Sequence, residues 1–135
     1  MRMTRGGFTL TEVLITVIII GILATAALAN YGSAVGRARY DTACAVLQQI
    51  YEGEWRYNAQ FNVFVARDAA STLVQWRDAL NMDKPTGTVV AYNAAITAPG
   101  FNANATSGGF TLTLSQDHAV SGTWLRPGGG TCNSF

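Results

Sequence analysis

The chain has few side chains of the types that carry out catalysis. Its one histidine, His118, follows Asp117 in a predicted turn, and the sequence places neither a cysteine nor a second histidine beside it. Nucleophilic catalysis needs a base within reach of the nucleophile, and a histidine-based zinc site needs further ligands. The glycines at 128–130 lack the Lys-Ser/Thr pair of a phosphate-binding loop. We therefore expect no enzyme, no metal and no cofactor, and a solvent-exposed turn at His118.

One ionisable side chain lies inside the longest apolar stretch. Residues 8–29 are 22 residues in which Glu12 is the only ionisable side chain. A helix of this length spans about 33 Å, roughly the hydrocarbon thickness of a bilayer. An ionised carboxylate is costly there unless it is paired or neutralised. We expect a helix that spans a membrane in at least one state of the protein, with a cation as the partner of Glu12.

The residues before this stretch predict its orientation. Arg2 and Arg5 are positive charges that keep a short N-terminus on the cytoplasmic side, so the chain after the helix is expected to face outward. The alternative is a secretory signal peptide, with residues 24–29 as its small-residue cleavage region. A very short leader ending in Gly6-Gly7, and the carboxylate of Glu12, favour the membrane helix instead.

The motif Gly7-Phe8-Thr9-Leu10-Thr11-Glu12, followed by the apolar run to Tyr31, resembles the N-terminus of a type IV pilin or a type II secretion pseudopilin. The resemblance implies that a prepilin peptidase cuts after Gly7 and N-methylates Phe8. It also implies partners: identical or related pilin subunits in a helical filament, and an inner-membrane assembly platform. The location it implies is the inner membrane before assembly and an extracellular pilus afterwards.

In the family, the glutamate that matches Glu12 pairs with the N-terminal amine of a neighbouring subunit. A missing partner in apolar surroundings leaves a stranded charge at about 3–5 kcal/mol, so a subunit out of register is penalised. The alternative is a pair within one chain, because Phe8 and Glu12 are four residues apart on one helix face. The family's usual proline, eight residues after Gly21, is Ala29 here, which leaves open whether residues 21–29 stay helical in a filament.

The helical pattern continues well beyond the apolar stretch. No proline occurs before Lys84, so we predict one helix from Phe8 to about Tyr57. The predicted divisions are a leader (1–7), an apolar stem (8–29), an amphipathic helical half (30–58) and a globular head (59–135). The apolar stripe of the second half comprises Ala43, Val46, Leu47, Ile50 and Tyr57.

The head is predicted to contain a short helix and a small sheet. The helix covers 68–82, with Leu73, Trp76 and Leu80 at helical spacing. The predicted strands are 88–97, 110–115 and 120–126, in which the inward-facing side chains are Val90, Tyr92, Ala94, Ile96, Phe110, Leu112 and Leu114. An α+β fold follows, a lollipop-shaped pilin fold with a three- or four-stranded antiparallel sheet on the long helix.

Residues 99–109 are polar and rich in glycine, and we expect them to form a mobile loop between the first two strands. They contain Asn104-Ala105-Thr106, which makes Asn104 a candidate for N-glycosylation.

Two cysteines, Cys44 and Cys132, complete the set of reactive side chains. Cysteines that face an oxidising compartment usually pair, so we expect a disulfide that holds the glycine-rich tail on the long helix. Two free buried thiols are the alternative. Type IV pilins commonly carry a disulfide in the C-terminal part of the head, and a cysteine in the helix departs from that pattern.

Composition narrows the function further. Charged residues make up 13% of the 135 residues, whereas about 25% is usual in soluble proteins. Hydrophobic residues make up 49%. Part of the surface is therefore expected to be covered. Nine basic and eight acidic residues give a formal charge of +1 without a basic stripe, so no specific nucleic-acid binding is expected.

Three classes of function remain open. The first is a structural type IV pilus subunit, favoured by the small head, Glu12 and the low charge. The second is a minor pilin or a secretion or competence pseudopilin. Some secretion pseudopilins bind calcium near their C-termini, whereas Asp78, Asp83 and Asp117 are scattered here. The third is a membrane-anchored binding module, which leaves the leader and Glu12 unexplained. The sequence does not distinguish whether such a filament serves adhesion, motility, DNA uptake or secretion.

Overall fold

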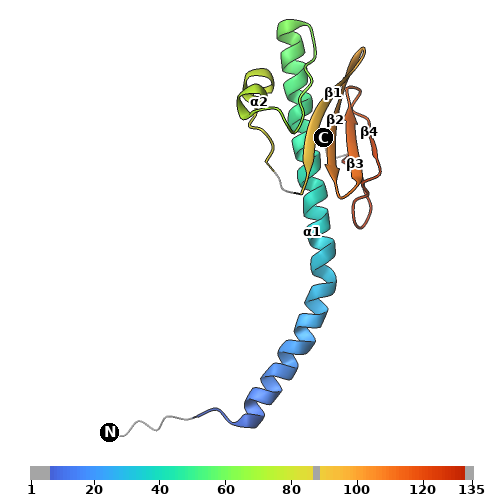
Figure 1. Cartoon of the computed structure of the whole chain (residues 1–135). Coiled ribbons are helices and arrows are strands. Elements are labelled where there is room, and N and C mark those ends of the chain that lie inside the picture. Colours follow the sequence, from blue (N-terminus) through green and yellow to red (C-terminus); the bar gives the residue numbers. More distant parts are fainter. Residues whose placement is uncertain (1–6, 87–88, 133–135) are drawn as a thin grey trace, which may run out of the picture. The chain divides into compact units, whose positions relative to one another are not determined.

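The structure is a computed structural model that describes residues 7–86 and 89–132, without the side chain of Ala29. Its elements follow the order α1, α2, β1, β2, β3 and β4 (Figure 1). A long N-terminal helix packs against a four-stranded antiparallel sheet, so the predicted α+β class is confirmed. The chain divides into two compact units, Met1–Val35 and Gly36–Phe135, and each is described separately.

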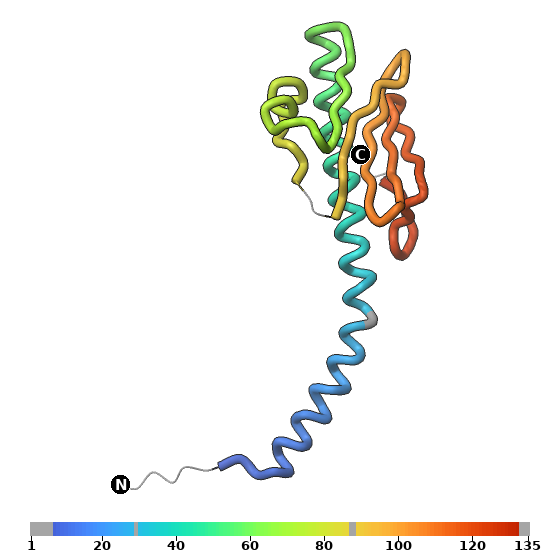
Figure 2. Tube along the Cα trace, viewed as in Figure 1, coloured from blue at the N-terminus to red at the C-terminus, as the bar shows by residue number. Residues whose placement is uncertain are grey.

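Helix α1 covers Leu10–Phe61, a run of 52 residues that can be followed along the chain trace in Figure 2. It begins two residues after the predicted start and extends four residues beyond Tyr57. The part in the first unit is apolar and exposed. Among the described residues, α1 is the one helix whose length and composition would allow it to cross a membrane.

The part of α1 in the second unit supplies one side of the core. Ala43, Leu47 and Ile50 are buried, as the predicted stripe requires, and Val46 and Tyr57 are partly buried. Tyr40 extends the buried face toward the N-terminus of this segment, and Cys44 lies beside Ala43 on it. One member of the buried face is ionisable: Glu54, which is 0% exposed.

The sheet has the order β1-β2-β3-β4, with antiparallel neighbours throughout. The strands are β1 Ala91–Thr97, β2 Gly100–Ser107, β3 Phe110–Ser115 and β4 Val120–Gly122. The buried side chains of β1, β2 and β3 alternate along each strand and pack in the core with α1: Tyr92, Ala94, Phe101, Ala103, Ala105, Leu112 and Leu114.

The predicted mobile loop at 99–109 is wrong, because most of it is β2, one of the two inner strands of the sheet. Its buried residues are Phe101, Ala103 and Ala105, so the inward face is apolar but mostly small. The turn into β3 uses Gly108 and Gly109, whose φ angles of 56° and 83° suit glycine.

Two predicted inward side chains are exposed instead. Ile96 is 53% exposed and Phe110 is 54% exposed. Each lies near a hairpin turn at an end of the sheet, where fewer neighbours cover a side chain. The last strand also ends earlier than predicted, at Gly122, where φ is 128°. Trp124 lies beyond it and packs edge-on against Tyr40, with ring centroids 6.1 Å apart.

Helix α2 covers Leu73–Leu80 and is shorter than the predicted 68–82. Thr72 and Gln75 form a capping box at its start, in which each side chain bonds to the other's backbone. Asn81 ends the helix in the left-handed conformation. Trp76 and Leu80 are buried as predicted, whereas Leu73 is 42% exposed because it lies in the first turn.

Candidate functional site

Glu12 lies in the first turn of α1, where its side chain caps the helix. The Glu12 N–H donates to Thr9 Oγ1 at 3.3 Å, while Glu12 Oε2 accepts from the Thr9 N–H at 3.5 Å and from Thr9 Oγ1 at 3.4 Å. This reciprocal pattern is a capping box, and a negative charge is favourable at a helix N-terminus. In the unprocessed chain the carboxylate of Glu12 is therefore held by its own helix end.

The sequence contained a signal for this arrangement, since Thr9-Leu10-Thr11-Glu12 has the T-x-x-E spacing of a capping box. The predicted pair between Glu12 and the amine of Phe8 is a different contact. In the intact chain the Phe8 nitrogen belongs to a peptide bond with Gly7, so a free amine exists only after cleavage. The pairing of Phe8 and Glu12 stays a prediction.

The apolar side chains around this motif have no cover. Phe8 is 83% exposed, and eleven further large apolar side chains from Leu10 to Leu28 are at least half exposed: Leu10, Val13, Leu14, Ile15, Val17, Ile18, Ile19, Ile20, Ile22, Leu23 and Leu28. Soluble monomers rarely expose apolar surface on this scale. Lipid or other apolar helices would cover such a surface.

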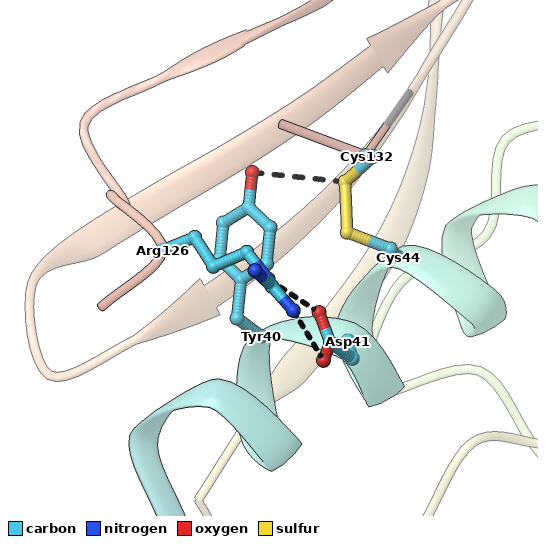
Figure 3. The surroundings of a disulfide bond; sticks show 5 residues. All are labelled: Tyr40, Asp41, Cys44, Arg126 and Cys132. Carbon is cyan, nitrogen blue, oxygen red and sulfur yellow. Dashed lines mark hydrogen bonds and ion pairs between the residues drawn. A yellow bond between two sulfur atoms is a disulfide. The ribbon is translucent and has the colours of Figure 1, made fainter. Parts of the chain in front are cut away.

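The second set of predicted site residues lies in the other unit. Cys44 on α1 and Cys132 in the tail form a disulfide, with Cα atoms 5.7 Å apart and a sequence separation of 88 (Figure 3). The hydroxyl of Tyr40 lies 3.8 Å from Cys132 Sγ. The bond joins the tail to the helical segment that packs under the sheet.

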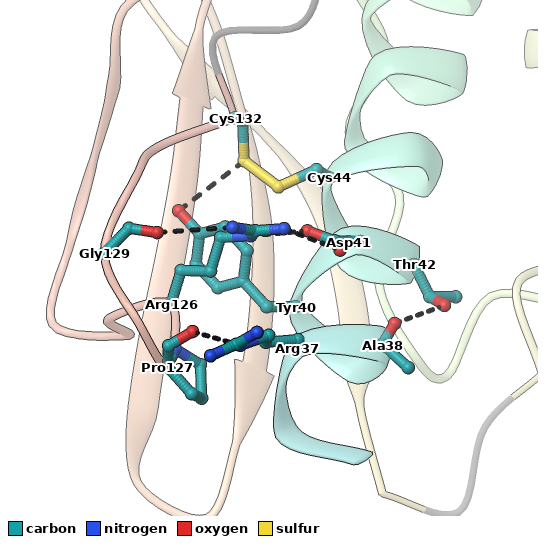
Figure 4. Close-up of polar contacts among 10 residues, drawn as sticks. All are labelled: Arg37, Ala38, Tyr40, Asp41, Thr42, Cys44, Arg126, Pro127, Gly129 and Cys132. Atoms are coloured by element: carbon teal, nitrogen blue, oxygen red, sulfur yellow. Dashed lines mark hydrogen bonds and ion pairs between the residues drawn. A yellow bond between two sulfur atoms is a disulfide. The ribbon is translucent and has the colours of Figure 1, made fainter. Parts of the chain in front are cut away.

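Polar contacts attach the same tail to α1 at two further points, and one more contact lies within the tail (Figure 4). Arg126 Nε and Nη2 donate to the two carboxylate oxygens of Asp41 at 2.9 and 3.2 Å, and Arg126 Nη1 donates to Gly129 O at 3.3 Å. Arg37 Nε donates to Pro127 O at 2.8 Å. The hydrogen bond and charge of Arg126 hold the pKa of Asp41 below its usual value. Sequence reasoning missed this pair, since nothing in the pattern links residues 85 apart.

The predicted turn at Asp117-His118 is present, and His118 adopts a φ of 61°. The imidazole stacks on the ring of Tyr51, with centroids 4.2 Å apart, and its Nε2 lies 3.3 Å from Gln48 Oε1. The described residues contain no group of three His, Cys, Asp or Glu side chains arranged to hold a metal ion. The contacts of His118 thus attach a loop to α1.

Asn104 lies on β2 and not in a loop. Its Oδ1 accepts a hydrogen bond from Thr113 Oγ1 at 2.8 Å, and its Nδ2 donates to Asn102 O at 3.4 Å. The side chain that a glycan would modify is therefore engaged within the sheet. Glycosylation of Asn104 stays a prediction without support from its position.

Comparison with known proteins bears on the N-terminal motif. Residues 2–28 match the prokaryotic N-terminal methylation motif. No curated protein and no solved structure matches the chain. The matched segment contains the Gly7-Phe8 junction, Glu12 and nearly all of the apolar run, so the resemblance stated from these residues is confirmed there. The chain carries, at residues 2–28, the class III prepilin signal of type IV pilins and pseudopilins.

Proposed function

We propose that the chain is a structural subunit of a type IV pilus, cleaved after Gly7, methylated on Phe8 and polymerised through its N-terminal helix. The methylation motif at 2–28 is the observation that carries the proposal. A motif of this pilin type points to a structural protein and not to an enzyme. The exposed apolar surface of residues 8–28 supports burial first in a membrane and then among other stems.

The contacts of Glu12 suggest how one side chain serves both states. In the membrane-inserted subunit, the capping box with Thr9 supplies hydrogen bonds to the carboxylate. In the filament, the new α-amino group of Phe8 on a neighbouring subunit supplies a full positive charge. The donors from Thr9 are neutral, whereas the Phe8 ammonium carries a charge opposite to that of the Glu12 carboxylate, so assembly exchanges neutral partners for a charged one.

The partners that follow are further copies of this chain or related pilins, a prepilin peptidase and an inner-membrane assembly platform. The subunit resides in the inner membrane before assembly and on the cell surface afterwards. A minor pilin or pseudopilin would carry the same motif, and the two roles differ in how much subunit reaches the surface.

The test is mass spectrometry of material sheared from the cell surface. The proposal predicts this chain as an abundant component, with an N-terminal peptide that begins at Phe8 and carries one extra methyl group. A mature terminus at Met1 or Asn30 would refute the processing. Correct processing with the chain absent from sheared material would instead assign it to a pseudopilin role.

A further inference from the structure

Glu54 is an ionisable side chain with no exposure, and the proposed function does not use it. Its Oε2 accepts a hydrogen bond from the Val65 N–H at 3.0 Å. Its Oε1 is buried and has no hydrogen-bond partner. Among the described residues, neither ion pair of the chain involves Glu54. A buried carboxyl with half of its oxygens unpaired is tolerated best when it is neutral.

The charged groups on the elements around Glu54 are engaged elsewhere. Arg67, in the segment after α1, donates to Gln75 O and to Ala66 O, so its charge acts on Glu54 only from a distance. On α1 itself, Arg56 donates to Glu52 O and Leu80 O.

On and beyond α2, Arg77 pairs with Asp83 and Lys84 donates to Ala69 O. Asp78 is exposed, and β1 contributes no charged side chain. None of these groups is a contact partner for the carboxyl of Glu54.

The Val65 contact lies where three elements meet. Segment 62–67 joins α1 to the edge of the sheet, because Arg67 and Ala94 exchange backbone hydrogen bonds of 2.9 and 2.6 Å. Helix α2 is attached to the same region through Arg67 Nε to Gln75 O at 3.1 Å and Arg56 Nη2 to Leu80 O at 3.3 Å. Helix α2 also carries a second buried polar atom without a partner, Trp76 Nε1.

We propose that Glu54 is a proton-operated latch that holds segment 62–67, and α2 with it, against α1. The latch is closed while the carboxyl carries its proton. When the carboxyl ionises, the buried charge has one hydrogen bond and no counter-ion. Opening of segment 62–67 gives water access to Oε1 and relieves that cost. The β2–β3 hairpin lies outside the latch, because its strands are held by their own backbone pairing.

The expected pH range follows from burial. Desolvation raises the pKa of Glu54 from 4.5 to about 7, while the Val65 N–H and the charge of Arg67 act in the opposite direction. In an open latch the carboxyl is hydrated and its pKa returns toward the lower value. Opening therefore becomes easier as the pH rises from about 4.5 to about 7, and no easier above that range.

The test is hydrogen exchange of the full chain in detergent micelles, read by mass spectrometry at about pH 5 and about pH 8 and corrected for intrinsic exchange rates. Peptides from 62–82 should lose protection by at least about tenfold at the higher pH, while peptides from 100–115 stay unchanged. Glu54→Gln cannot ionise and should remove the pH dependence. Glu52→Gln, an exposed acid on the same helix, should behave as wild type.

Equal loss of protection in both regions, or the same pH dependence in Glu54→Gln, would overturn the proposal. If Glu54→Gln does not fold, a titration of the wild-type chain tests the proposal instead. Its glutamate carboxyl carbons can be titrated by ¹³C NMR, and one should titrate near pH 7 in parallel with the loss of protection. Titration of every glutamate near its usual value would contradict the latch.

Discussion

Asp41 shows how one side chain can hold a distant segment in place. Its carboxylate accepts two hydrogen bonds from Arg126, and the pKa of Asp41 is lowered by that contact. A carboxyl whose pKa is lower in the folded state stabilises the fold above its usual pKa. That contribution is lost as the pH falls through the folded-state value. The contact between tail and helix should therefore weaken in acid and remain constant from neutral to alkaline pH.

We expect Asp41→Asn to speed the reduction of the Cys44–Cys132 bond several-fold at neutral pH, since a tail without its ion pair exposes the sulfurs to the reductant more often. Timed exposure to a thiol reductant followed by alkylation measures the rate. Asp83→Asn, which removes the exposed pair with Arg77, is the matched control. Equal rates in wild type and Asp41→Asn would show that the ion pair does not hold the tail.

The sequence contained signals for two features of the proposed sites, the buried Glu54 and the capping box of Glu12. Glu54 follows Leu47 and Ile50 at spacings of seven and four, so it occupies a position of the buried stripe. A charged residue at such a position is a reason to expect a buried titratable group. Thr9, three residues before Glu12, marked the capping box. The ion pair of Asp41 with Arg126 had no such signal, because only the folded tail brings them together.

At the scale of elements, the close approach of α1 and α2 depends on a glycine. A Cβ at Gly53 would lie 2.9 Å from Leu80 Cβ and 3.0 Å from Leu80 O. Alanine normally favours a helix interior by about 1 kcal/mol over glycine. Here it would force the two helices apart, at a cost of about 1–3 kcal/mol.

Gly53→Ala should therefore lower the free energy of unfolding of the Gly36–Phe135 unit. Urea unfolding followed by tryptophan fluorescence reports on this unit, because Trp55, Trp76 and Trp124 all lie in it. Gly32→Ala is the control, since a Cβ at Gly32 meets nothing within 4 Å. A Gly53→Ala chain as stable as wild type would mean that the helices tolerate a wider spacing.

Strand β2 explains why the sheet was only partly predictable. Its buried positions are Phe101, Ala103 and Ala105, and its other positions are mostly Asn, Thr and Ser. Strand prediction relies on β-branched and aromatic residues, which are scarce here. The Gly108-Gly109 pair before the alternating β3 was the available hairpin signal. The alanine side chains of β2 are buried because the sheet packs on α1, and this tertiary contact cannot be read from the local sequence.

For the whole molecule, the two units were predictable to different degrees. The first unit follows from length and hydropathy, because a 22-residue apolar run with one carboxylate has few other structures open to it. The second depends on contacts between segments far apart in the chain, such as Arg67 with Ala94 and Arg126 with Asp41. Local pattern predicted its helices and three of its four strands, whereas β2 depended on long-range packing.

The proposed function requires that Glu12 act in assembly and not in membrane insertion. In a packed bundle of stems, a Phe8 amine without a carboxylate is a stranded charge that costs about 3–5 kcal/mol per subunit. In the lipid-embedded subunit, loss of Glu12 removes a carboxylate from the first turn of the helix, a contribution of only about 1 kcal/mol. The two states should therefore respond very differently to the same substitution.

The most direct measurement is an immunoblot of membrane and sheared surface fractions from cells that produce Glu12→Ala. The processed subunit should be present in the membrane at wild-type abundance, while surface filaments fall sharply. Glu52→Ala, which removes an exposed acid from the same helix, should assemble normally. A wild-type yield of filaments from Glu12→Ala cells would show that the carboxylate of Glu12 is not needed for assembly.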